Sequence, residues 1–337
     1  MKKLSAINKF LYIVNIIIAL FLAISYLLPY VSPKSFPSLA VISLGVPILI
    51  MLNLLFVIYW LVQLKKALFI SLIILLLGFN YMTSLFLISG KDIATNNDLK
   101  VMSYNVKGFN HLGWKKRERT KKFIIDFIKT KNIDVLVIQE YLIATNNDFG
   151  FEYQFVKTKN PKNRFGQAIF SNHPIIASGS LDFKESNNNG IYVDLIVELD
   201  TVRIYNIHLE SLKVNPSKEN FGEENSEKLY QRIKNTFSKQ AYQTETVVNH
   251  KKQWKGKTIV CSDLNNTAYS WVYNELSNDM KDAFLEAGKG FGKTYDYPFP
   301  LRIDFIFTDE KATVNHFKIF DIKNSDHFPI MTHLNWK

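Results

Sequence analysis

The sequence predicts an α/β domain over residues 99–337, preceded by an apolar segment over residues 1–90 and a linker over residues 91–98. The first 90 residues contain no acidic residue and no arginine, whereas the rest of the chain has an ordinary mixture of charges. In that second part, strand-like and helix-like runs are mixed, and some strand-like runs follow one another at hairpin distance. This pattern favours an α/β fold with partly antiparallel pairing. A length of 337 residues suits two domains or one large one.

The charge of the chain is divided unevenly. Residues 1–90 carry six lysines, so the remainder carries 35 basic and 30 acidic residues, or +5 of the total of +11. A mildly basic domain is a poor argument for nucleic-acid binding. The single cysteine, Cys261, excludes an internal disulfide and lies in a strand-like run, where we expect a small buried thiol.

Three long apolar runs occupy the N-terminal segment, at Phe10–Leu28, Leu39–Leu64 and Ala67–Ile88. Each is long enough to cross roughly 30 Å of hydrocarbon as a helix. A cleaved signal peptide is the alternative for the first run, but no small-residue cleavage site follows it and two more runs do. We therefore expect three transmembrane helices that anchor the chain.

Lysine positions set the expected orientation of these helices. Lysines flank the start of the first run and lie between the second and third, whereas the loop between the first and second holds only Lys34. Lysine is enriched on the cytoplasmic side of spanning helices. With three crossings, we expect a multi-pass protein of the inner or plasma membrane, with an extracytoplasmic domain after Ile88. The polar stretch Ser89–Asp98, which includes the linker, would hold that domain near the bilayer, because its ten residues reach at most about 35 Å when extended.

Periodicity assigns the elements of the second part. Lys115–Thr130 has the spacing of an amphipathic helix, with Ile124 and Ile128 on one face. Helices are also expected over Ser226–Lys252 and Trp271–Ser277. The expected strands, in chain order, are Leu99–Asn105, Ile133–Gln139, Gln167–Phe170, Ile191–Leu199, Val202–His208, Thr258–Ser262 and Arg302–Thr308, with Lys318–Asp321 leading to a last polar cluster.

A polar cluster ends the strand Thr258–Ser262. Asp263 and Asn265 lie two positions apart and so face the same side of an extended chain. A carboxylate beside an amide suits a hard cation and a phosphate oxygen. The same pair is also ordinary turn chemistry after a strand, and the two interpretations stay open from these residues alone.

Similar polar residues end or follow other apolar runs: Asn105, Glu140, His208 and the pair Asp326-His327. Taken singly, each has an ordinary structural role as a turn cap, a solvated strand end or a buried histidine. Asp304 is harder to explain in this way, because it lies within the apolar run 303–307. A carboxylate there must be paired, metal-bound or neutral.

The motifs that contain these residues are Ser-Tyr-Asn105-Val, Ile-Gln139-Glu140, Asn206-Ile-His208-Leu, Ser262-Asp263-Leu-Asn265, Arg302-Ile-Asp304-Phe-Ile and Ser325-Asp326-His327-Phe-Pro329. In this order they resemble the motifs of the endonuclease/exonuclease/phosphatase (DNase I-like) superfamily, over about residues 98–337. The resemblance implies a four-layer α/β sandwich, with two mixed β-sheets flanked by helices. It also implies divalent-metal-dependent hydrolysis of phosphate esters, with Mg²⁺ or Mn²⁺ as the cofactor.

The resemblance also implies a role for each residue. Glu140 resembles the principal metal ligand, with Asn105 beside it and Asp326 as the ligand on the second side. Asp263 resembles the residue that orients or deprotonates the attacking water, and Asn265 the residue that holds a phosphate oxygen. His327 resembles the histidine that contacts the scissile phosphate, and Asp304 the carboxylate that orients the His327 ring. His208 resembles the second histidine, which protonates the leaving oxygen.

Two basic residues stand near these motifs. Many nucleases of the superfamily carry an acidic or polar residue two places after the first asparagine, where this chain has Lys107. A lysine there would lower the negative charge of the site or contact phosphate. Arg164 precedes a strand and is either a phosphate clamp or a surface arginine.

Three functions remain open from the sequence. One is a membrane-tethered endonuclease or other phosphodiesterase that cuts external nucleic acid. The second is a lipid phosphodiesterase, similar to a sphingomyelinase, or a phosphatase. The short linker favours it, and so do aromatic residues expected on loops, namely Trp114, Phe149, Phe151 and Phe221, although ordinary packing within the loops is the commoner role of such residues. The third is an inactive binding module anchored in the membrane. The expected partners are the lipid bilayer and a phosphate ester, and no protein partner is indicated.

Overall fold

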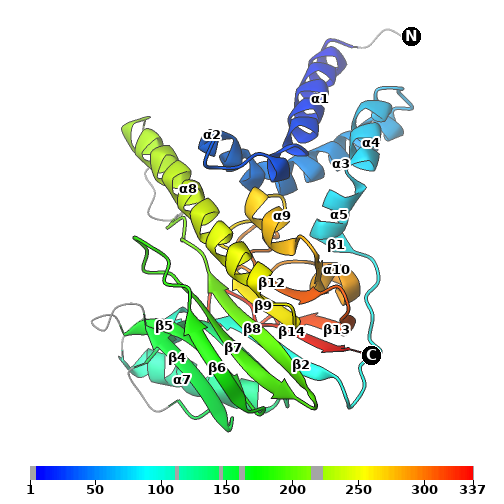
Figure 1. Cartoon of the computed structure of the whole chain (residues 1–337). Helices are drawn as coiled ribbons and strands as arrows, with labels where there is room; N and C mark the ends of the chain where they lie inside the picture. The colour runs from blue at the N-terminus through cyan, green and yellow to red at the C-terminus, as the bar shows by residue number, and fades with distance from the viewer. Residues whose placement is uncertain (1–4, 111–113, 144–146, 159–163, 214–222, 337) are drawn as a thin grey trace.

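The computed structural model describes residues 5–110, 114–143, 147–158, 164–213 and 223–336. Two six-stranded sheets lie face to face with helices outside, and the N-terminal helices stand on one side of this sandwich (Figure 1). Each sheet contains one parallel strand pair among antiparallel ones, so both are mixed. The prediction of two mixed sheets flanked by helices is confirmed.

The first sheet has the strand order β10-β12-β9-β8-β7-β6. Its parallel pair is β8 with β9, and its other neighbours are antiparallel. The bounds of its strands are β6 Ile175–Ser180, β7 Gly190–Val197, β8 Asp200–His208, β9 Lys257–Asp263, β10 Met280–Asp282 and β12 Asp304–Asp309.

The second sheet has the order β13-β14-β2-β3-β5-β4, with β2 and β3 parallel. The bounds of its strands are β2 Leu99–Asn105, β3 Val135–Leu142, β4 Tyr153–Thr158, β5 Phe165–Ser171, β13 Thr313–Ile319 and β14 Ile330–Asn335. Asp304, expected inside a strand, is instead the first residue of β12 in the first sheet.

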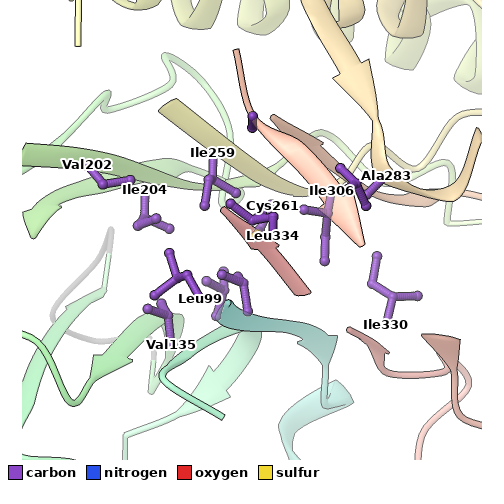
Figure 2. Close-up of a cluster of buried hydrophobic side chains, with 14 of the residues drawn as sticks. Leu99, Val135, Val202, Ile204, Ile259, Cys261, Ala283, Ile306, Ile330 and Leu334 are labelled. Atoms are coloured by element: carbon purple, nitrogen blue, oxygen red, sulfur yellow. The ribbon is translucent and has the colours of Figure 1, made fainter. Parts of the chain in front are cut away.

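The main core lies between the sheets (Figure 2). Alternate residues of each strand face it, as a two-residue side-chain period requires. The labelled members of this core are Leu99, Val135, Val202, Ile204, Ile259, Cys261, Ala283, Ile306, Ile330 and Leu334. The predicted role of Cys261 as a buried thiol is confirmed, because its side chain is fully buried in this cluster.

Helices cover the outer face of each sheet. Helix α7 (Trp114–Lys129) packs Ile124 and Ile128 onto the second sheet. Helices α8 (Glu223–Gln253) and α9 (Trp271–Ser277) pack onto the first. The short helix α10 comprises Ala283–Ala287, and α6 (Lys107–Asn110) is a tight turn with left-handed residues.

Two helical segments near the N-terminus are long and apolar enough to cross a membrane. They are Ala6–Tyr30, with 25 residues and a mean hydropathy of 2.5, and Pro37–Val62, with 26 residues and a mean hydropathy of 2.7. The elements within them are α1 Ala6–Ser25, η1 Leu28–Tyr30, α2 Pro37–Ala40, η2 Val41–Gly45 and α3 Val46–Val62.

The third predicted transmembrane helix, at Ala67–Ile88, is wrong as one continuous span. It is divided into α4 (Leu68–Leu77) and α5 (Phe79–Leu85), which are bent by 78°. Gly78 lies at the bend, where a glycine is a common cause of a kink. The ring of Tyr26 fills the space that a side chain at Gly78 would need, and its hydroxyl donates to the Ile74 carbonyl at 2.8 Å.

The end of the third run is extended. Strand β1 (Phe86–Leu87) pairs with β11 (Gly290–Phe291) of the following domain. The linker over residues 91–98 then runs along that domain, because the amides of Lys91 and Ile93 donate to the carbonyls of Ala287 and Asn315. The N-terminal helices and the sandwich are therefore packed against each other rather than joined by a free tether.

Candidate active site

The strand register brings the predicted residues to one end of the sandwich. In the first sheet, His208 pairs with Asp263 on the parallel neighbour, and Asp304 pairs with Asp263 on the antiparallel one. In the second sheet, Asn105 pairs with Gln139, next to Glu140. Carboxyl ends of parallel strands share an edge, so both parallel pairs end at the same opening between the sheets.

A bulge in β3 places Glu140 in this opening. In a regular strand, Gln139 and Glu140 would face opposite sides of the sheet. The pairing of β3 with β5 shifts register here, and Glu140 has a φ of 50°. As a result both side chains point toward the first sheet: Gln139 donates to Asn206 Oδ1 at 2.9 Å, and Glu140 Oε1 lies 3.9 Å from His208 Nε2. Such a strained bulge is a frequent way of aiming an active-site side chain.

Asn105 joins the two sheets at the centre of the site. Its side-chain nitrogen donates to Asp263 Oδ2 at 2.8 Å and to Glu140 Oε1 at 3.3 Å. Its side-chain oxygen accepts the amide of Lys107 at 3.0 Å. Its own carbonyl accepts the Ser325 hydroxyl at 2.8 Å, which places the segment containing Asp326 beside it. Asn105 is buried, so these bonds hold the carboxylates in fixed relative positions.

His327 lies between two buried carboxylates. Its Nδ1 is 3.0 Å from Asp304 Oδ2, and its Nε2 is 3.7 Å from Asp263 Oδ2. Burial alone would lower the pKa of His327, but the carboxylates of Asp304 and Asp263 outweigh it and raise that pKa to about 10. Burial raises the pKa of Asp304 to about 6, against the opposing effect of the His327 charge. The ring is therefore an imidazolium at neutral pH.

His208 faces the same carboxylates from the other side. Its Nε2 lies 3.5 Å from Asp263 Oδ2 and has no hydrogen-bond partner among the described residues, although the atom is buried. Its backbone amide is fixed by the Asn189 carbonyl at 2.9 Å. A buried ring nitrogen without a partner, next to two carboxylates, is suited to a ligand oxygen.

Asp326 and Lys107 form the more exposed part of the site. Lys107 Nζ lies 2.5 Å from Asp326 Oδ2, and the two side chains are 48% and 26% exposed. Lys107 has a left-handed φ of 47°, which turns the chain sharply after β2. The sequence left open whether this lysine contacts phosphate or reduces the negative charge; in the structure it neutralises Asp326.

Of the two other predicted residues, Asn265 lies beside Asp263, whereas Arg164 lies on the surface before β5. Asn265, with a left-handed φ of 47°, donates its side-chain nitrogen to the Leu209 carbonyl at 3.0 Å, and its amide donates to Asp263 Oδ1 at 2.9 Å. Arg164 is exposed just before β5, and among the contacts of the described residues none joins its side chain to the carboxylates. The structure therefore gives no support to Arg164 as a phosphate clamp.

Two residues that the sequence analysis did not identify also shape the site. The hydroxyl of Thr294 accepts the amides of Ile303 and Asp304 at 3.0 and 3.1 Å. The ring of Tyr295 meets the ring of His327 edge-on, with centroids 5.0 Å apart. Burial, then the charges of Asp326, Asp263 and Glu140, raise the pKa of Tyr295 to about 12. These residues lie in a loop without a motif, so only the tertiary structure reveals them.

The donor set fits a hard divalent cation. The site contains four carboxylates, those of Glu140, Asp263, Asp304 and Asp326. The basic side chains that face them are Lys107 and the two histidines, His208 and His327, so negative charge is in excess. Oxygen ligands with excess negative charge are those that Mg²⁺ and Mn²⁺ prefer.

Two sets of ligands for such an ion deserve comparison. The ligand atoms of Asp263, Asp304 and His327 lie within 4.8 Å of one another and could hold an ion by geometry alone. In the structure both ring nitrogens of His327 already face carboxylates, Nδ1 that of Asp304 and Nε2 that of Asp263. The second set is the one that the resemblance implies, namely the oxygens of Glu140, Asn105 and Asp326.

A cleft of about 340 Å³ opens beside these groups, lined in part by Lys107, Glu140, Lys157, Asn188 and His208. A larger cavity, of about 520 Å³, lies between the segment 210–213 and α8. The smaller cleft is the better candidate for the substrate, because Glu140 and His208 line it.

Solved structures with the same fold include the following three. The human Nocturnin catalytic domain with bound sulfate is 18% identical, with a TM-score of 0.55, over 71% of this chain and 94% of that one. D. rerio TDP2 with a single-strand DNA product is 18% identical, with a TM-score of 0.54, over 71% and 99%. A mannosyl-6-phosphatase of Bacteroides thetaiotaomicron is 13% identical, with a TM-score of 0.52, over 71% and 100%. At these identities the likeness extends to the fold alone.

Family profiles match both parts of the chain, while the comparison with curated protein sequences returned no match. Residues 8–85 match a profile described as a domain of unknown function. Residues 102–327 match the profile described as the endonuclease/exonuclease/phosphatase family. This second match spans most of the chain and every predicted site residue. The chain therefore belongs to the endonuclease/exonuclease/phosphatase family.

Proposed function

We propose that the chain is a Mg²⁺- or Mn²⁺-dependent hydrolase of phosphate esters, and more narrowly a phosphodiesterase or endonuclease. The observation that carries the proposal is the buried ring of His327, held between Asp304 and Asp263 beside the Glu140 and Asn105 side chains. A fixed cation beside oxygen ligands is complementary to a phosphate ester, whose negative charge otherwise resists attack.

The residues divide the chemistry between them. A bound divalent ion would neutralise charge on the phosphate, and Glu140, Asn105 and Asp326 would hold it. Asp263, which is fully buried, is placed to orient or deprotonate a water molecule. His327 would contact a phosphate oxygen, and Asp304 fixes the orientation of its ring.

Two further groups would act on the substrate. The unpartnered Nε2 of His208 is available to give a proton to the leaving oxygen, since it is buried and aimed at the same carboxylates. The side-chain nitrogen of Asn265 donates a hydrogen bond to the Leu209 carbonyl. To hold a phosphate oxygen, Asn265 would have to replace this bond with one to the substrate.

The proposal includes a membrane location. The two long apolar segments, with the bent pair α4 and α5 as a third, would anchor the chain as a multi-pass protein. The lysines at the start of the first segment and after the second favour an extracytoplasmic catalytic domain. A protease-cleavable tag placed after Lys337 tests this sidedness: in intact spheroplasts it should be cut from outside, and protection there would reverse the orientation.

Hydrolysis assays on the full chain in detergent test the function. Bis-p-nitrophenyl phosphate, plasmid DNA and sphingomyelin are each supplied with Mg²⁺ or Mn²⁺, and again with EDTA. We expect metal-dependent turnover of at least one diester, lost in Glu140→Gln and kept in Glu310→Gln, an exposed control. No turnover of any ester with metal present would favour the inactive binding module instead.

A lipid phosphodiesterase or phosphatase is the second candidate. The catalytic domain packs directly on the apolar helices, through the paired strands β1 and β11 and the stacked rings of Tyr81 and Tyr269. Phe149 and Phe151 pack in the core beneath α7, which agrees with the ordinary packing role that the sequence analysis kept open for them. Phe221 and the side chain of Trp114 lie outside the described residues. Turnover of sphingomyelin without cleavage of DNA would select this candidate.

A further inference from the structure

The loop that follows the catalytic strand β9 is buried against the N-terminal helices. Asp263 and Asn265 begin this loop, and Thr267 and Tyr269 continue it. The Thr267 hydroxyl donates to the Ser43 carbonyl at 3.2 Å, and both residues are buried. We call the contact made by Ser43, Tyr81, Thr267 and Tyr269 the anchor–loop contact.

Tyr269 belongs to the hydrophobic core of the N-terminal helices. Its ring stacks on Tyr81 with centroids 5.5 Å apart and an interplanar angle of 15°, and its hydroxyl donates to the Tyr81 carbonyl at 3.1 Å. It is 3% exposed and packs in one cluster with residues of the N-terminal segment, namely Leu22, Leu28, Val46, Ile50, Leu75 and Leu85. Because this core comes from α1, α3, α4 and α5, the position of Tyr269 depends on how those helices pack.

Helix α8 holds the same loop from the other side. The buried side chain of Gln240 donates to the carbonyls of Leu264 and Asn265, both at 3.3 Å, and accepts from Asn266 Nδ2 at 2.8 Å. Helix α8 itself is tied to the N-terminal segment, since Lys34 lies 2.9 Å from Glu245. The loop is thus held by the N-terminal segment through Ser43 and Tyr81 and by α8 through Gln240, and α8 itself contacts the N-terminal segment.

The chain between the site and the anchor–loop contact is short and mostly buried. Three residues lie between Asn265 and Tyr269, so the two Cα atoms are at most about 14 Å apart even when the chain is fully extended. Asn265 is already held at a left-handed φ of 47° and by its bond to Leu209. A displacement of Tyr269 would therefore strain this short stretch of chain and the bond that the Asn265 amide makes with Asp263.

We propose that the N-terminal helical segment is part of the active-site scaffold, with Tyr81 and Tyr269 as positioning residues that hold the catalytic loop through the anchor–loop contact. The inference rests on the proposed function for its catalytic readout. It assigns the segment a role beyond anchoring: the packing of the apolar helices sets the geometry of Asp263 and Asn265.

The test uses the full chain in lipid nanodiscs. Tyr81→Ala removes the ring on which Tyr269 stacks, and Phe86→Ala removes a matched aromatic pair, since Phe86 meets Phe291 across the same two parts of the chain without touching the loop. Turnover of bis-p-nitrophenyl phosphate should fall by about 10²-fold in kcat for Tyr81→Ala, with KM changed much less, because a misplacement of about 1 Å suffices for such a loss. Phe86→Ala should keep the wild-type rate.

Two further readouts separate positioning from simple unfolding. Tyr269→Phe keeps the ring and should restore most of the activity that Tyr269→Ala loses. Hydrogen exchange of residues 264–270 should become faster in Tyr81→Ala while exchange in β2 and β8 stays slow. If Tyr269→Ala does not fold, the activity and hydrogen exchange of Tyr81→Ala still test whether the N-terminal helices position the catalytic loop.

Two outcomes would overturn the inference. The first is an active wild type whose kcat survives Tyr81→Ala. The second is unchanged exchange of residues 264–270 in that variant. An inactive wild type would count against the proposed function alone, and the exchange measurement would then decide the role of the helices.

Discussion

The two sides of the site differ in how firmly they are held. On what we call the histidine side, the side chains of His208, Asp263, Asp304 and His327 are at most 8% exposed and face one another. On the carboxylate side, the side chains of Lys107, Glu140 and Asp326 are 48%, 36% and 26% exposed. The first side is buried and is held by the hydrogen bond between His327 and Asp304, while the second offers oxygens to an exchangeable cation.

Burial explains the difference, because charges interact strongly in the buried part of the site and are screened by water in the exposed part. Buried charges persist only when paired, so His327 and Asp304 must keep each other's orientation whatever is bound. On the exposed side, water weakens the attraction between Lys107 and Asp326, so a divalent ion can compete with the lysine there. The histidine side is therefore preorganised, and the carboxylate side is adjustable.

The largest effect should come from the histidine side. His327→Ala removes the imidazolium and leaves Asp304 and Asp263 buried without their shared partner, so kcat should fall by about 10²- to 10⁴-fold. His316→Ala, in a histidine on β13, is the matched control and should leave the rate unchanged. Near-normal turnover in His327→Ala would remove this residue from the chemistry.

The next effect should come from Glu140. Glu140→Gln keeps the size of the side chain and removes its charge. Because Glu140 would bind the ion directly, metal affinity should fall by more than the roughly 10- to 100-fold loss seen when a residue that only hydrogen-bonds a ligand is changed. The half-saturating Mg²⁺ concentration of the hydrolysis reaction measures this loss. An unchanged Mg²⁺ requirement would mean that the ion binds elsewhere.

A smaller effect of opposite sign should come from Lys107. Lys107→Met removes the cation that pairs with Asp326 and should lower the half-saturating Mg²⁺ concentration by up to about fivefold, the range of an exposed ion pair. Lys157→Met, at the edge of the same cleft, is the control. A higher Mg²⁺ requirement in Lys107→Met would instead indicate that the lysine binds substrate.

The smallest effect concerns His333, a histidine outside the active site whose pKa is lowered in spite of the nearby Asp98 and Asp134 carboxylates. Burial, then the nearby His316 and Lys100, lower the pKa of His333 on β14 below its ordinary value. The unfolded chain therefore binds this proton more readily, so the His333 contribution to stability is complete above about pH 6.5 and is lost as the pH falls below it. His333→Gln should flatten the decline of the thermal midpoint between about pH 7 and 5; an equally steep decline would contradict this assignment.

Much of the fold was predictable because buried strands carry continuous apolar runs. Leu99–Asn105 and Trp271–Ser277 have the predicted bounds, and the polar residues that end such runs do meet at one opening. The strands β4 and β6, which are partly exposed, escaped prediction, and so did β10, β14 and most of β13. The break at Gly78 depends on the ring of Tyr26, far away in sequence, which no local pattern reveals.

The site shows the same limit. Residues at strand ends, such as Glu140 and His208, were predictable from position and chemistry. Tyr295 and Gln240 act through contacts made only after folding, with His327 in one case and with the loop after β9 in the other. The role of Arg164 could not be decided from the sequence, because the position of a basic residue before a strand does not determine the direction of its side chain.

Binding of Mn²⁺ to the full chain, followed by electron paramagnetic resonance, tests the division of the site most directly. The account predicts that Glu140→Gln loses the bound signal, whereas His327→Ala retains it even though it no longer turns over substrate. Loss of the signal in His327→Ala with retention in Glu140→Gln would place the ion among Asp263, Asp304 and His327 and contradict the account.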